Sequence, residues 1–189
     1  DFLYPNPASV LAFIENHDTD RFLGEGDNLP MLKQASTLLL TTRRIPQLYY
    51  GTEIMMNGVK SKSDGYVRKD FPGGWTGDTE TAGRSKIQNE CYNFYKTLLN
   101  WRKGNDVIAK GSMVQFMVQN GVYAYARQHE GKTVFVMLNG TDAETTVPLK
   151  FYKEILKDSK QGKDILSGKT VAFGESLTMG PRESLVIEL

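Results

Sequence analysis

Cysteine and histidine are scarce in this sequence, and their scarcity limits the chemistry open to it. Cys91 is the only cysteine, so no disulfide can form within the chain and no cysteine cluster can hold a metal. The two histidines, His17 and His129, lie far apart in the sequence and in different predicted domains. We therefore expect no metal site built on them and no cofactor bound by this chain.

An excess of one charge and long apolar runs are also missing. Lys and Arg number 23 against 22 Asp and Glu, which gives no indication of binding to nucleic acid or to an anionic membrane. No apolar run approaches the roughly 18 residues of a membrane-spanning helix. The chain begins at Asp1 without an initiator methionine or an apolar leader, and we interpret this start as a cut within a longer protein.

Strand-like and helix-like patterns alternate in the first hundred residues. Val10–Glu15 and Ile45–Tyr50 are short apolar runs that predict buried strands, and Leu29–Arg43 between them predicts a helix. This order is typical of parallel β/α folds. Residues 58–84 lack periodicity, and their Gly and aromatic content favours an ordered surface loop. A further helix is predicted from an N-cap at Ser85 to about Arg102.

The pattern changes after Gly104, where we place a domain boundary. Short strand-like segments follow, and the Asn120–Gly121 pair between two of them predicts a hairpin. Several short strands at this spacing predict an antiparallel β-sandwich. The expected strands are Met113–Gln119, Val122–Gln128, Thr133–Leu138, Thr145–Leu149, Thr170–Phe173 and Ser184–Leu189.

Asn16, His17 and Asp18 follow directly after the first predicted strand, which is where barrel enzymes place active-site residues. Amide, imidazole and carboxylate groups this close together could contact several hydroxyls of one sugar ring. A polar loop that caps a helix explains the same residues equally well. Arg21, a few positions on, is expected to form a structural salt bridge.

Other candidates for sugar binding lie further along the chain. Arg68, Asp70 and Trp75 would combine an aromatic platform with hydrogen-bonding groups, although the loop could equally pack its own aromatic rings. Tyr49 and Tyr50 should face opposite sides of a strand, so only one can line a site. We select Tyr50, with core packing as the favoured alternative.

Phe13 and the Asn16–His17–Asp18 motif resemble the fourth conserved region of the α-amylase family, glycoside hydrolase family 13. Ile45–Glu53 (IPQLYYGTE) resembles the family's eighth barrel strand, and Arg68–Trp75 resembles its neopullulanase and cyclomaltodextrinase branch. The resemblance covers essentially the whole chain. It implies that residues 1–103 are the C-terminal portion of a (β/α)₈ barrel, with strands seven and eight, and that residues 104–189 form the β-sandwich domain.

The resemblance implies retaining hydrolysis of α-1,4 glucosidic bonds in pullulan, cyclodextrins, maltooligosaccharides or starch. Asp18 would stabilise the transition state, and the substrate-binding residues would be Asn16, His17, Tyr50, Arg68, Asp70 and Trp75. No segment of the chain matches the family motifs that carry the nucleophile and the general acid. We therefore expect the chain alone to be inactive.

Some consequences of the resemblance stay open. A non-catalytic carbohydrate-binding or structural unit is the alternative to an enzyme part. Calcium is possible in a full-length protein, and the location would be periplasmic or cytoplasmic in a bacterium. A truncated barrel has open strand edges, so we also expect self-association.

Overall fold

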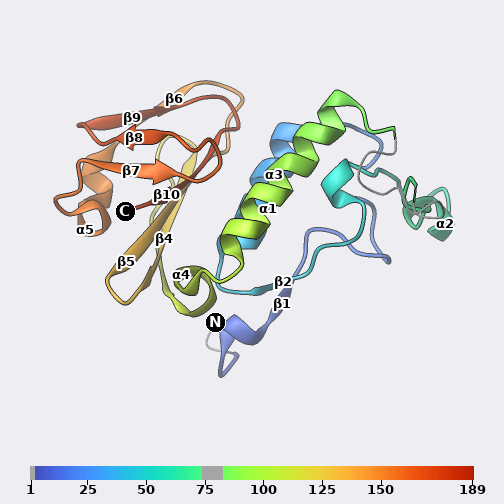
Figure 1. The fold of residues 1–189 in the computed structure, drawn as a ribbon, viewed down its shortest axis with the longest axis horizontal. Coiled ribbons are helices and arrows are strands. Elements are labelled where there is room, and N and C mark those ends of the chain that lie inside the picture. Colours follow the sequence, from blue (N-terminus) through green and yellow to red (C-terminus); the bar gives the residue numbers. More distant parts are fainter. Residues whose placement is uncertain (1–2, 74–82) are drawn as a thin grey trace.

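The computed structural model describes residues 3–73 and 83–189 of the chain. Figure 1 shows two long helices with irregular loops on one side and a β-rich part, which holds the C-terminus, on the other. The first part contains η1 (Pro7–Ser9), β1 (Leu11–Ala12), α1 (Leu29–Thr41), β2 (Ile45–Pro46), η2 (Thr52–Ile54), α2 (Asp64–Val67) and α3 (Lys86–Arg102).

The two strands of the first part are much shorter than the sequence predicts. β1 and β2 pair in parallel through two residues each, with Leu11 opposite Ile45. Each strand has a single neighbour among the described residues, and a pair of strands without further partners is marginally stable. Beyond Pro46 the chain leaves the extended conformation for a turn at Gly51, whose φ is 84°. The predictions Val10–Glu15 and Ile45–Tyr50 were therefore too long.

The two long helices confirm the expectation from the sequence. Asn28 caps α1 by accepting a hydrogen bond from the Met31 N–H, and Ser85 and Gln88 form a reciprocal capping box at the start of α3. The helices pack on each other through a shared apolar core. Its fully buried members include Leu32, Leu40, Cys91, Tyr95 and Leu98.

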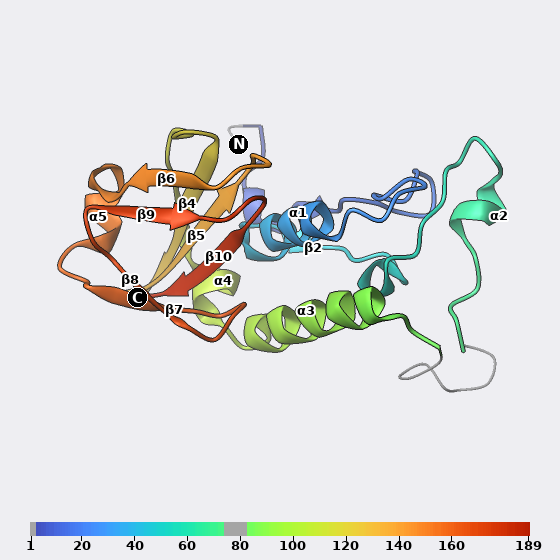
Figure 2. The same cartoon turned by 90° about the horizontal axis from the view of Figure 1, so that it is seen from above.

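The β-rich part is antiparallel throughout its described strands, as predicted. A six-stranded sheet has the order β3-β4-β5-β10-β7-β8. A separate pair joins β6 to β9, which lie side by side in Figure 2. Side chains from both sheets share one core. The elements are α4 (Asp106–Lys110), β3 (Ser112–Gln115), β4 (Val122–His129), β5 (Lys132–Asn139), β6 (Thr145–Pro148), η3 (Leu149–Tyr152), α5 (Lys153–Leu156), β7 (Gln161–Asp164), β8 (Thr170–Ala172), β9 (Ser176–Met179) and β10 (Ser184–Glu188).

The Asn120–Gly121 turn confirms the predicted hairpin. Both residues have positive φ, 51° and 79°, which is the conformation of a tight two-residue hairpin turn. Gln119 and Val122 on either side exchange backbone hydrogen bonds of 3.0 and 2.8 Å. The pairing of Gln119 with Val122 is shifted by one residue from the β3–β4 register, in which Gln115 lies opposite Tyr125, so the chain carries one extra residue between Gln115 and Gln119.

Polar contacts join the helices to the sheet. Arg127, buried in β4, donates from Nη1 to the Thr41 carbonyl at 3.0 Å, and the Tyr125 hydroxyl bonds the Thr41 hydroxyl. Trp101 Nε1 at the end of α3 donates to Glu188 Oε1 at 2.7 Å. These bonds hold the C-terminal ends of both helices against the sheet. The domain division at Gly104 stays a prediction.

Candidate functional site

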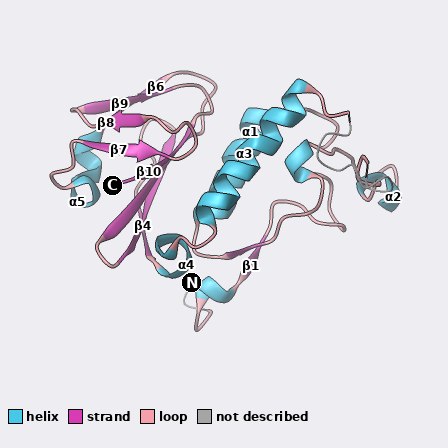
Figure 3. Cartoon of the chain, viewed as in Figure 1, coloured by secondary structure: helices cyan, strands magenta, loops and turns pink. Residues whose placement is uncertain are grey.

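The Asn16–His17–Asp18 segment lies in the long loop between β1 and α1 (Figure 3). The Asn16 side chain accepts a hydrogen bond from the Asp18 N–H at 2.8 Å, and the Asn16 N–H donates to the Thr19 hydroxyl at 3.0 Å. These local bonds fold the loop without a regular element. The side chains of His17 and Asp18 stay 60% exposed, so both are open to a ligand.

Arg68, just after α2, reaches this loop from a distant part of the sequence. Its Nη2 lies 3.1 Å from Asp18 Oδ1, and its Nε donates to the His17 carbonyl at 3.0 Å. The other carboxylate oxygen of Asp18 lies 3.1 Å from His17 Nε2. The structure thus brings together four residues that the sequence singles out, Asn16, His17, Asp18 and Arg68.

Two residues of this group were not among the sequence candidates. Lys60 donates from Nζ to the Asp18 carbonyl at 3.0 Å, and Asp64 Oδ2 lies 3.4 Å from Arg68 Nη2. Lys60, Asp64 and Arg68 follow one another at intervals of four residues. That spacing is the one signal in the sequence that could have indicated them.

A buried ion pair lies beside the Asn16–His17–Asp18 loop. Arg21 and Glu15 have side chains that are 1% and 2% exposed, and Nη1 of Arg21 lies 3.3 Å from Glu15 Oε1. Arg21 also donates to the carbonyls of Tyr50, at 2.7 Å, and Val67, at 2.9 Å. The expected structural salt bridge at Arg21 is confirmed, and it ties together three segments that flank the loop.

Tyr49 and Tyr50 do not face opposite sides of a strand, so that prediction was wrong. β2 ends at Pro46, and the two rings instead meet edge to face with centroids 4.7 Å apart. The Arg21 guanidinium lies 4.0 Å from the Tyr49 ring centroid and 5.0 Å from that of Tyr50. Tyr50 is 40% exposed, and its hydroxyl donates to the Lys69 carbonyl at 2.7 Å.

Of the remaining candidates, Asp70 does not join this group. Asp70 is exposed and forms no ion pair or hydrogen bond with a described residue. Trp75 lies outside the described residues. Within the described ranges no cluster of His, Cys, Asp and Glu could hold a metal, and no helix is long and apolar enough to cross a membrane.

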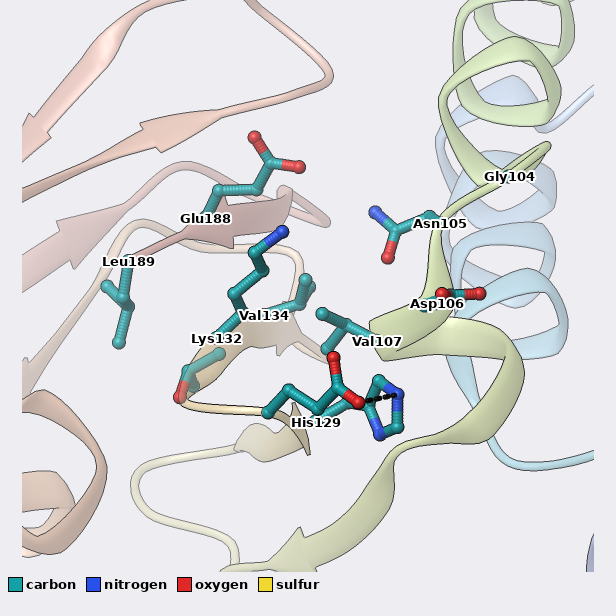
Figure 4. A pocket seen from close by; sticks show the side chains of 11 residues that line it. Gly104, Asn105, Asp106, Val107, His129, Lys132, Val134, Glu188 and Leu189 are labelled. Carbon is teal, nitrogen blue, oxygen red and sulfur yellow. Dashed lines mark ion pairs between the residues drawn. The ribbon is translucent and has the colours of Figure 1, made fainter.

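A hollow lies between α4, the β4–β5 hairpin and the end of β10, away from the Asp18 loop. In Figure 4 the Lys132 side chain extends into the space between Asn105 and Glu188. Nε2 of His129 lies 3.8 Å from Glu130 Oε1 at the rim, and the His129 side chain is partly buried. Glu188, on the wall of this hollow, also accepts the hydrogen bond from Trp101.

Three kinds of comparison relate the chain to known proteins. Residues 113–188 match the family model of the cyclo-malto-dextrinase C-terminal domain. An α-amylase from Niallia circulans is 31% identical over 177 residues, which are 89% of this chain and 31% of the relative. A cyclomaltodextrin glucanotransferase from Thermoanaerobacterium thermosulfurigenes is 32% identical over 164 residues, 82% of this chain and 21% of the relative. The chain belongs to the α-amylase family.

A solved structure of an Anoxybacillus α-amylase shares the fold of this α-amylase family member. The TM-score is 0.78 at 21% identity, and the match covers 98% of this chain and 39% of that one. The chain thus spans less than a third of the length of the two curated relatives named above. These matches establish the family and the fold of the chain.

Proposed function

We propose that this chain is part of a retaining α-glucan hydrolase and supplies the residue that stabilises its transition state, Asp18. The observation that carries the proposal is the meeting of Asn16, His17, Asp18 and Arg68 in one exposed loop cluster of an α-amylase family member. The substrate class is an α-1,4-linked glucan: pullulan, a cyclodextrin, a maltooligosaccharide or starch.

The barrel assignment is part of the same proposal. We infer that β1 and β2 correspond to strands seven and eight of a (β/α)₈ barrel and that residues 1–103 belong to it, with residues 104–189 as the sandwich domain. The parallel pairing of β1 with β2, with α1 between them in sequence, supports this. The polar loop follows the carboxyl end of β1, which is the end of a barrel strand that carries catalysis.

Asp18 would act on the sugar ring without attacking it. In a retaining enzyme one carboxylate forms a bond to the anomeric carbon and a second protonates the leaving oxygen. Asp18 would accept hydrogen bonds from ring hydroxyls, and these bonds strengthen as positive charge develops on the ring in the transition state. His17 would donate to the same sugar, and Arg68 would hold the Asp18 carboxylate in place.

Exposed ion pairs contribute little stability, about 0–1 kcal/mol, so a sugar hydroxyl can displace one of these contacts at low cost. The 40% exposed ring of Tyr50 offers a face for stacking a sugar. Asp70 and Trp75 remain proposed substrate contacts. The nucleophile and the general acid have no counterpart in this sequence, so the chain by itself should not hydrolyse its substrate.

The test compares the chain alone with the longer polypeptide that supplies the two missing carboxylates. The chain alone should release no reducing ends from pullulan, cyclodextrin or starch. In the longer protein Asp18→Asn should lower kcat by about 100-fold or more, because a contact specific to the transition state is weakened. Asp142→Asn is the control, since Asp142 lies 83% exposed in an ion pair on the β-rich part.

Unchanged kcat in the Asp18→Asn protein would contradict the role of Asp18. Turnover by the chain alone that disappears in Asp18→Asn would contradict its inactivity. Sugar binding without turnover in the longer protein would instead support the non-catalytic carbohydrate-binding unit.

A further inference from the structure

A groove beside α5 gathers lysines that the proposed function does not use. Its walls carry Lys150, Lys153, Lys157 and Lys160, against one acidic residue, Glu175. Its volume is about 640 Å³, within the range of pockets that hold small ligands. Four positive charges against one negative give the groove an excess of three.

None of these four ammonium groups has an anionic partner among the described residues. Lys150 lies 5.3 Å from the Phe151 ring centroid, and no ion pair or side-chain hydrogen bond to a described residue engages the others. Glu154 and Asp158 belong to the same segment but do not line the groove. A concave surface with one sign of charge concentrates ions of the opposite sign.

The backbone at Lys157 provides an independent observation. Lys157 has φ 49° and ψ −120°, in a turn that the Ser159 N–H closes on the Leu156 carbonyl at 2.9 Å. This is the first central position of a type II′ turn, which glycine normally occupies because a side chain is strained there. Strained non-glycine residues cluster at functional sites. Here the strained residue places a lysine on the wall of the groove.

We propose that this groove binds a phosphate anion, either free inorganic phosphate or the phosphate ester of a sugar. Lysine ammonium groups are compact point charges with three donors each, suited to the oxygens of a tetrahedral anion. Figure 1 shows α5 and α2 at opposite ends of the molecule. The groove is therefore separate from the Asp18 cluster, and its ligand does not depend on the proposed reaction.

The direct test is calorimetric titration of the chain with inorganic phosphate, glucose 6-phosphate and glucose. Inorganic phosphate and glucose 6-phosphate should bind and glucose should not, and added NaCl should weaken the binding. Tighter binding of glucose 6-phosphate would assign an ester as the ligand, whereas equal affinities would assign phosphate itself. Absence of phosphate binding at millimolar concentration would overturn the proposal.

Paired variants separate a built site from general attraction to a basic surface. The double variant Lys153→Gln/Lys160→Gln should weaken phosphate binding at least 10-fold. Lys96→Gln/Lys169→Gln removes the same charge at exposed positions outside the groove and should change the affinity less than 2-fold. Equal weakening in both variants would overturn the proposal.

Lys157→Gly tests whether the strained turn serves binding. Glycine fits the positive φ, so the melting temperature should rise while phosphate affinity falls at least 3-fold. A purely structural role for this lysine would leave the affinity unchanged. That outcome would remove Lys157 from the proposed site.

Discussion

Two arginines near the Asp18 loop act in different environments. Arg21 is buried against Glu15, whereas the side chain of Arg68 is 40% exposed beside Asp18. Glu15 Oε2 also accepts the Phe22 N–H at 2.5 Å, and its Oε1 accepts the Thr52 hydroxyl. Both oxygens of this carboxylate therefore form hydrogen bonds within the fold. The buried Arg21–Glu15 pair holds the loop against the segments that flank it, and the exposed Arg68–Asp18 pair orients the Asp18 carboxylate.

Removal of Arg21 should therefore be costly. In Arg21→Ala the Glu15 carboxylate would stay buried without its charged partner, which costs about 3–5 kcal/mol. Urea unfolding followed by circular dichroism measures this change. The control is Arg182→Ala, which breaks an ion pair with Asp142, a side chain that is 83% exposed, and should destabilise the protein much less. Similar losses in the two variants would show that burial does not govern the contribution of Arg21.

The Cys91 thiol should be inert in the folded protein. Cys91 is fully buried in α3, and burial raises the pKa of its thiol to about 12. Because only the thiolate reacts with disulfide reagents, labelling at pH 8 should be negligible in buffer and complete in denaturing urea. Rapid stoichiometric labelling of the native chain would contradict the placement of Cys91.

At the scale of elements, two hairpin glycines have the same conformation and different surroundings. Gly121 has φ 79° and a Cβ added there would lie 2.4 Å from Thr141 Cγ2. Gly131, between β4 and β5, has φ 77° and nothing within 4 Å of such a Cβ. Replacing each glycine with alanine therefore separates the energetic cost of backbone strain from the cost of steric overlap.

Gly131→Ala should cost about 1–2 kcal/mol, the cost of a left-handed conformation for alanine. Gly121→Ala should cost at least about 1 kcal/mol more, because Thr141 must move to accommodate the methyl group. Thermal unfolding of both variants measures the difference. Equal destabilisation would mean that Thr141 rotates away freely and that the close approach has no energetic consequence.

Elements with local signals were predictable from the sequence, and elements without them were not. Caps and apolar periodicity gave α1 and α3, and turn residues gave the β3–β4 hairpin. β7 is Gln-Gly-Lys-Asp, and neither its composition nor its length distinguishes it from a loop. Its buried members are Gly162 and Asp164, which are placed there by strand pairing and by hydrogen bonds to neighbouring backbone rather than by hydrophobicity.

The same distinction applies to the candidate site. A contiguous motif identified Asn16, His17 and Asp18, and Arg68 came from a resemblance on a separate loop. Their meeting depends on a fold that brings positions fifty residues apart within 3.1 Å. Lys60 and Asp64 belong to no motif, and their four-residue spacing from Arg68 is the one sequence signal that links them to the site.

For the whole molecule, the helical part has apolar surface that its described residues leave uncovered. Leu11, Phe13 and Ile45, on or beside the short parallel pair, are 52%, 45% and 51% exposed. β1 and β2 have no further strand neighbours among the described residues, so backbone groups at both edges are available for pairing. Exposed strand edges with apolar side chains promote association between chains.

We therefore expect the isolated chain to associate as its concentration increases. Sedimentation velocity from about 5 to 200 μM should show a rising weight-average sedimentation coefficient, and the double variant Leu11→Lys/Ile45→Lys should abolish the rise because charge at a strand edge opposes pairing. Phe151→Lys is the matched control, since Phe151 is 44% exposed but lies next to α5, away from the open edges. If Phe151→Lys abolished the association and the strand variant did not, the contact would lie on the β-rich part. A monomer at every concentration would mean that this apolar surface is too small to drive association.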